Sequence, residues 1–275
     1  MAGDADPVSG VSADESAQAR TKSGDQLISV SALVRVVRTF CWGAAAAFAI
    51  TVGIGAVAPT WGLVIAEALQ RMYLAPGYFL AQYLSARATI TLANSLAALG
   101  ASVLGASGAL LVARIQRADA AAQRSYGACG RAAYAVVSSL CSVARKAAPA
   151  LGEARDTAAE ASAAIAVLAP RLSVACSGCA LGVYLAASLL QGWIPQVLRV
   201  VVGLLPHGIF ELPAMLVSAA VGVAISDRLV AAARHGLRCV DDAARHLLIS
   251  PRLVRILALV VALIVIGAAI EVRTM

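Results

Sequence analysis

The residues of this chain whose types and spacing could do chemistry lie in its carboxyl-terminal third, in the segment PHGIFELP at residues 206–213. This segment interrupts a long apolar run. An ionisable side chain near the centre of a bilayer is costly, so it usually faces protein or water. If the segment is helical, the i, i+4 spacing of His207 and Glu211 places them on one face, where a hydrogen bond or an ion pair can form. The spacing therefore predicts a polar contact at membrane depth.

The backbone of the same segment is also unusual. Pro206 removes the amide that would bond to the carbonyl of Val202, and Pro213 removes the amide that would bond to that of Ile209. Gly208 allows the backbone to bend between the two prolines. Carbonyl groups freed at membrane depth need partners, which are a side chain, another helix or an ion. The segment therefore predicts a break in a membrane helix.

Two interpretations of this pair stay open. His207 and Glu211 could satisfy each other and fix a kinked helix, or they could form a proton, ion or substrate site. Hydrolysis has less support, because one His and one Glu do not supply the three protein ligands of a catalytic zinc. The chain has no HExxH, GxSxG or Walker-type motif. We therefore expect no catalytic residues, no metal and no cofactor.

A second candidate pair, Cys176 and Cys179, has the CxxC spacing of some metal and redox sites. It lies in an apolar run without a second pair or a nearby His. Small packing residues of a membrane helix are the favoured interpretation of both cysteines.

Composition indicates which elements position these residues. Of the 275 residues, 60% are apolar and 13% are charged, whereas a soluble domain has about a quarter charged residues. The apolar runs are about twenty residues long, the length of a membrane-spanning helix, and lack the period-two alternation of barrel strands. We predict an all-α, polytopic transmembrane helix bundle. The net charge of +7 comes from basic residues beside the apolar runs, which favours membrane topology and argues against nucleic acid as a partner.

Five spans are predicted, and they are Thr39–Ala58, Thr89–Val112, Leu172–Leu190, Ile194–Ile225 and Leu253–Ile270. The second run is rich in Gly and Ser, so we expect it to lie inside the bundle. The fourth run has 32 residues and three prolines. It is too long for one plain span, so we expect a pair of half-helices broken at the PHGIFELP segment.

The rest of the chain divides around these spans. We predict a disordered cytoplasmic tail at 1–30, two spans with an interfacial loop at 31–113, an Ala- and Arg-rich cytoplasmic helical segment at 114–171, and three spans at 172–275. Residues 61–84 fit either interfacial helices or a re-entrant hairpin, and Pro149 and Pro170 are expected to interrupt the Arg-rich segment. With the amino terminus inside, most basic residues fall inside. The charge distribution therefore predicts a multi-pass cell-membrane protein with a cytoplasmic amino terminus and an external carboxyl terminus.

The string PHGIFELPA, preceded by Val-Val-Gly-Leu-Leu and followed at 220–225 by Ala-Val-Gly-Val-Ala-Ile, resembles the signature of the stage II sporulation protein M family. The site residues that this resemblance selects are Pro206, His207, Gly208, Phe210, Glu211, Leu212 and Pro213. Asn94 in the second run is similar to an Asn in an earlier helix of the family and is an additional polar candidate. The long segment between Arg114 and Arg171 departs from the compact pattern of the family.

The resemblance implies an integral membrane protein. The namesake belongs to the machinery of membrane engulfment in spore-forming bacteria, where it scaffolds peptidoglycan-cutting partners, and many relatives occur in organisms that do not sporulate. The leading hypothesis is a non-enzymatic scaffold or subunit of a membrane complex. Its expected partners are the lipid bilayer, other membrane proteins or a cytoplasmic partner on the basic segments, with a homo-oligomer left open. The alternatives are a transporter or channel component that uses His207 and Glu211 and, third, an intramembrane enzyme.

Overall fold

The computed structural model describes residues 28–64, 67–68, 71, 84–122 and 128–274, and this part of the chain contains helices and no strand. The elements are α2 (Val30–Val57), α4 (Ala86–Ala122), α5 (Ala128–Ala147), the 3-10 turn η1 (Pro149–Glu153), α6 (Thr157–Ala233), α7 (Leu237–Leu248) and α8 (Pro251–Thr274). Within them, five segments are long and apolar enough to cross a membrane, namely Val30–Val57, Thr91–Ile115, Thr157–Gln191, Gly208–Ala233 and Pro251–Ile270. The all-α polytopic fold is confirmed.

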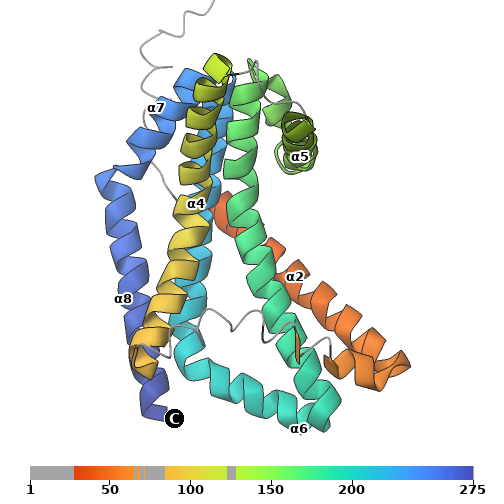
Figure 1. The fold of residues 1–275 in the computed structure, drawn as a ribbon. Helices are drawn as coiled ribbons and strands as arrows, with labels where there is room; N and C mark the ends of the chain where they lie inside the picture. The colour runs from red at the N-terminus through yellow and green to blue at the C-terminus, as the bar shows by residue number, and fades with distance from the viewer. Residues whose placement is uncertain (1–27, 65–66, 69–70, 72–83, 123–127, 275) are drawn as a thin grey trace, which may run out of the picture.

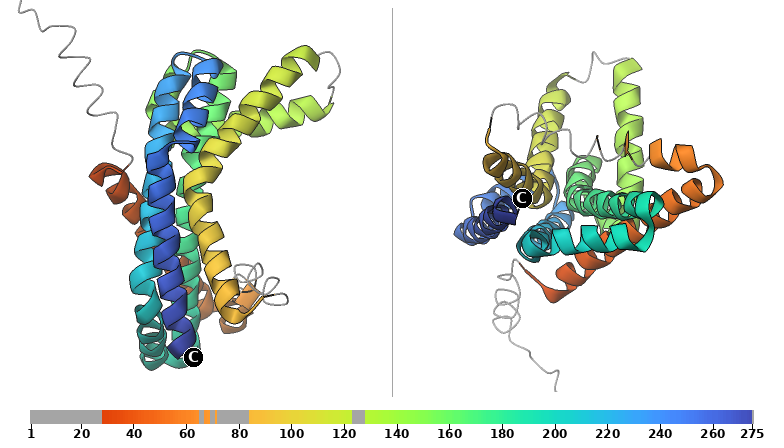
Figure 2. Two further views of the ribbon diagram at one scale, coloured as in Figure 1. Left: turned by 90° about the vertical axis from the view of Figure 1, so that its left-hand side faces the viewer. Right: turned by 90° about the horizontal axis from the view of Figure 1, so that it is seen from below.

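The helices α2, α4, α8 and the two long arms of α6 form the bundle (Figures 1 and 2). Helix α6 runs down one side, crosses at the lower end in Figure 1 and returns upward. We name its two apolar segments, Thr157–Gln191 and Gly208–Ala233, the first and the second arm of α6. The part between them, residues 192–207, is the crossing segment. At the opposite end lie α5, η1, α7 and the adjoining turns of α4 and α6, which we name the cap (Figure 1).

One carboxylate links the start of α6 to the start of α7. Asp156 is the N-cap of α6, where its Oδ1 accepts from the amide of Ala159 at 2.6 Å. Its Oδ2 accepts from the amide of Leu237, the first residue of α7, at 3.3 Å. Gly236, which directly precedes Leu237, has φ +104, a backbone conformation that residues with a Cβ rarely adopt. One aspartate therefore positions the starts of two helices.

Small residues bring α2 against the first arm of α6. Gly178 and Gly182 lie one turn apart, and a Cβ on either would overlap backbone atoms of α2, a carbonyl of Phe40 in one case and of Ala44 in the other. Such GxxxG spacing allows helix backbones to approach closely in a membrane, where packing drives helix association. The contact depends on the absence of these two side chains.

Helix α4 packs against both arms of α6, as the glycine- and serine-rich sequence predicted. A Cβ on Gly105 would lie 3.0 Å from the carbonyl oxygen of Ala166 and 3.4 Å from Cδ of Pro170. Pro170 is itself buried, and a Cβ on Gly222 of the second arm would lie 2.9 Å from its Cβ. The predicted interruption at Pro170 is wrong, because α6 continues through it. The carbonyl that would accept the missing amide of Pro170 belongs to Ala166 and faces α4.

The cap has a core of its own that continues into the spans. Fully buried side chains of this core come from η1, α6, α7 and α8, and they include Leu151, Val167, Leu229, Val240 and Leu253. The predicted segment 114–171 is helical in its described part. It does not end at residue 171, since α6 passes from the cap into the bundle without a break. The predicted tail at 1–30 is described only from residue 28, and most of the predicted loop at 61–84 lies outside the described residues.

Candidate functional site: the turn of helix α6 and the charged cluster at the cap

The PHGIFELP segment lies where the crossing segment meets the second arm of α6 (Figure 1). Its backbone is helical throughout, so the predicted break takes the form of a change in direction without a gap in the helix. The apolar stretch that starts at Gly208 has 26 residues, a complete span. The predicted pair of half-helices is therefore wrong. The fourth run instead divides into a crossing segment and one full-length span.

Side chains of the segment face in different directions. Glu211 and Phe210 are half-buried, whereas Ile209 and Pro213 are exposed on the outside of the bundle. A Cβ at Gly208 would meet nothing within 4 Å, so close packing does not require a glycine there. The side chains of Pro206 and His207 lie outside what the structure describes. The predicted contact between His207 and Glu211 stays a prediction.

Asn94 is half-buried on α4, one turn before Ala98. Ala98 belongs to a small buried cluster with Ala214, Val260 and Ile264, and its carbonyl accepts the hydroxyl of Ser218 at 2.5 Å. Asn94 and the PHGIFELP segment therefore lie at the same end of the bundle, on two helices that pack together.

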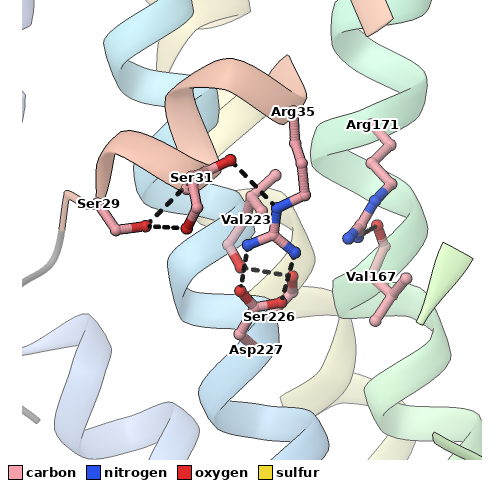
Figure 3. A network of polar contacts seen from close by, with 9 residues as sticks. Ser29, Ser31, Arg35, Val167, Arg171, Val223, Ser226 and Asp227 are labelled. Carbon is pink, nitrogen blue, oxygen red and sulfur yellow. Dashed lines mark hydrogen bonds and ion pairs between the residues drawn. The ribbon is translucent and has the colours of Figure 1, made fainter. Parts of the chain in front are cut away.

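A charged cluster that the sequence did not single out as a site lies at the other end of the spans (Figure 3). Arg35 of α2 binds Asp227 of α6 through two hydrogen bonds, Nη2 to Oδ2 at 2.6 Å and Nη1 to Oδ1 at 3.4 Å. Arg171, on the first arm of α6, donates from Nη1 to the carbonyl of Val167 at 2.6 Å. In the sequence, the two arginines indicated only topology. The signal that could have identified this cluster was Asp227, an acidic residue that follows an apolar run and begins a basic stretch.

The cap holds a second ion pair, whose carboxylate is more buried than that of Asp227. Arg145 of α5 donates from Nε and Nη2 to the two carboxylate oxygens of Glu160 at 2.5 and 2.7 Å. The Glu160 side chain is only 11% exposed. Its hydrogen bonds and negative charge raise the pKa of Arg145, and burial, followed by the charge of Glu160, raises the pKa of the nearby Cys141 thiol. This pair joins α5 to α6.

Metal-ligand clustering is absent from the described residues, because no three side chains of His, Cys, Asp or Glu gather there. The two CxxC cysteines are free, with Cys176 exposed and Cys179 half-buried on the first arm of α6. Cys179 fits the predicted packing role better than Cys176 does.

Together, the five apolar helices and their small-residue contacts define a polytopic α-helical integral membrane protein. The family model described as Stage II sporulation protein M matches residues 158–273. That part of the chain, which contains almost all of α6 with the PHGIFELP segment and then α7 and α8, is similar to the stage II sporulation protein M family, as the motif predicted. Helices α2, α4 and α5 lie outside the match. No curated protein and no solved structure matches the chain.

Proposed function

We propose that this protein is a non-enzymatic membrane scaffold, a subunit that holds partner proteins at a fixed position relative to the bilayer. The observation that carries the proposal is the continuity of the cap with the spans. One buried cluster contains side chains of α4, α5, η1, both arms of α6, α7 and α8. A partner bound to such a cap is held by helices that themselves enter the membrane.

The cap also has the charge of a cytoplasmic surface. Exposed basic residues gather there and at the adjoining ends of the spans, and they include Arg114, Lys146, Arg234, Arg238 and Arg255. Basic residues flanking membrane spans favour the cytoplasmic side. We therefore place the cap in the cytoplasm and the turn of α6, together with the carboxyl terminus, on the outer side.

Site-specific photo-crosslinking at native expression tests the scaffold. A photoreactive amino acid at Val136 or Val143, exposed on α5 of the cap, should yield a discrete protein adduct that recurs in independent preparations. Matched probes at Leu104 of α4 and Leu259 of α8 are comparably exposed on the spans, and the proposal predicts mainly lipid adducts there. Two results together would contradict the scaffold. The cap probes would give no protein adduct, and the chain would purify alone in mild detergent.

The position of Glu211 supports the transporter alternative less well than the scaffold. This residue lies in the first turn of the fourth span, whereas transporter sites lie near the bilayer midplane. Reconstituted vesicles decide between the two hypotheses. Proton or ion flux that disappears in Glu211→Gln would favour transport, and flux that is absent from both proteins would favour the scaffold.

A further inference from the structure

Arg171 has more hydrogen-bonding capacity than its protein surroundings use. A guanidinium carries five N–H donors. The described residues provide one acceptor for it, the carbonyl of Val167 one turn earlier in the same helix. The side chain is nonetheless half-buried, so water reaches it only in part. A half-buried cation with unused donors is suited to an anionic ligand.

The surroundings of Arg171 leave a positive charge. The charged side chains of Asp227 and Arg35 lie beside it and form a bidentate pair with each other. Figure 3 shows the guanidinium groups of Arg35 and Arg171 at one level of the bundle, with the carboxylate of Asp227 close below Arg35. Two cations and one anion leave a net charge of about +1 in this cluster. The Arg35 and Asp227 side chains are each 44% exposed, so the cluster is open to the surface.

The cluster lies one hydrocarbon thickness from the turn of α6. From Arg171 to Gln191, the end of the first apolar arm, are 20 residues, and from Gly208 to Asp227 are 19. At the helical rise of 1.5 Å per residue, both distances are about 30 Å. If the turn of α6 lies at one face of the hydrocarbon core, the cluster lies at the other face, at the depth of lipid phosphates.

We propose that Arg171 and Arg35 bind the phosphate of an anionic phospholipid in the leaflet at the cap. Guanidinium groups bind phosphate oxygens in a bidentate geometry with charge assistance, and basic pockets between membrane helices bind anionic headgroups. Asp227 limits the affinity, because it occupies Arg35 and repels the phosphate. A lipid is favoured over a free anion, since headgroups are concentrated at this depth. Val34 and Leu172, the apolar sequence neighbours of Arg35 and Arg171, are also exposed and available to acyl chains.

Native mass spectrometry of the full chain in neutral detergent tests this site by counting retained phosphatidylglycerol and phosphatidylcholine. The wild type should retain phosphatidylglycerol in preference to phosphatidylcholine. Arg171→Gln should weaken that retention about tenfold, since a charge-assisted hydrogen bond contributes on this scale. Arg255→Gln, an exposed arginine at the start of α8, is the matched control and should retain lipid as the wild type does.

The variant Asp227→Asn separates a lipid site from a merely structural cluster. It removes the competing carboxylate, so retention of phosphatidylglycerol should rise, a gain that misfolding cannot produce. Equal loss in Arg171→Gln and Arg255→Gln, or loss instead of gain in Asp227→Asn, would overturn the proposal. Displacement of the lipid by inorganic phosphate at the same concentration would also overturn it, because the site would then bind a free anion.

Discussion

Replacing Gly182 by alanine should weaken the contact between α2 and the first arm of α6. A Cβ at this position would overlap the carbonyl oxygen of Ala44 and lie 2.9 and 3.0 Å from the carbonyl carbon and Cα of that residue. Carbon atoms prefer separations of about 3.5–4.0 Å, so α2 must move outward by about 0.5–1 Å. Overpacking of this kind costs about 1–3 kcal/mol.

Gly53 of α2 supplies the matched control. A Cβ there would meet nothing within 4 Å, so Gly53→Ala removes a glycine from a helix without a clash. That change should leave stability unchanged or raise it by up to about 1 kcal/mol. The two variants differ from the wild type by one methyl each, and the structure predicts opposite signs.

Thermal unfolding in a single detergent, followed by fluorescence-detected size exclusion, measures the difference. At roughly 2–4 °C per kcal/mol, Gly182→Ala should melt several degrees below the wild type and Gly53→Ala should not. A cysteine pair at Ala47 and Val183, which lie in one small buried cluster, should crosslink less efficiently when Gly182 is alanine. Equal melting temperatures for both variants with undiminished crosslinking would refute the close approach of these helices.

Three further predictions each concern a single side chain. Arg145→Ala leaves a carboxylate of α6 buried without its partner and should lower the melting temperature more than Lys146→Ala, its exposed neighbour; equal effects would mean that the ion pair does not hold α5 in place. Burial raises the pKa of the Cys141 thiol, so maleimide should label this thiol more slowly between pH 7 and 8 than it labels the exposed Cys239; equal rates would contradict that burial. Ser218→Ala removes an interhelical hydrogen bond to α4 and should cost about 0.6 kcal/mol in chemical unfolding, and a stabilised variant would contradict that bond.

The number of spans and their order could be read from the sequence, because length and apolarity alone determine which helices fit a bilayer. The signature at Pro206–Pro213 was likewise sufficient to indicate the family, but it predicted a pair of half-helices where α6 is continuous and changes direction. The first arm of α6 was predicted from Leu172, yet the helix starts at Thr157. Alanine-rich helix looks alike inside and outside the membrane, so composition could not show that the two parts are continuous.

The contacts between helices could not be predicted from the sequence and are known only from the structure. Pro170 reads as an interruption in the sequence, but in the fold it packs between Gly105 and Gly222, and this packing offsets the cost of a proline inside a helix. The ion pair of Arg35 with Asp227 joins residues 192 positions apart. No local pattern encodes such a pairing, because it depends on how α2 lies against the second arm of α6.

Labelling of single cysteines with a membrane-impermeant maleimide tests the five-span arrangement most directly. In a cysteine-free background, a probe at Ile194 in the crossing segment should react in intact cells, and one at Val143 in the cap only after the membrane is opened. A probe at Leu259, exposed in the middle of α8, should resist labelling in both conditions because lipid surrounds it. Reaction of Ile194 and Val143 from the same side, or rapid labelling of Leu259, would contradict the arrangement.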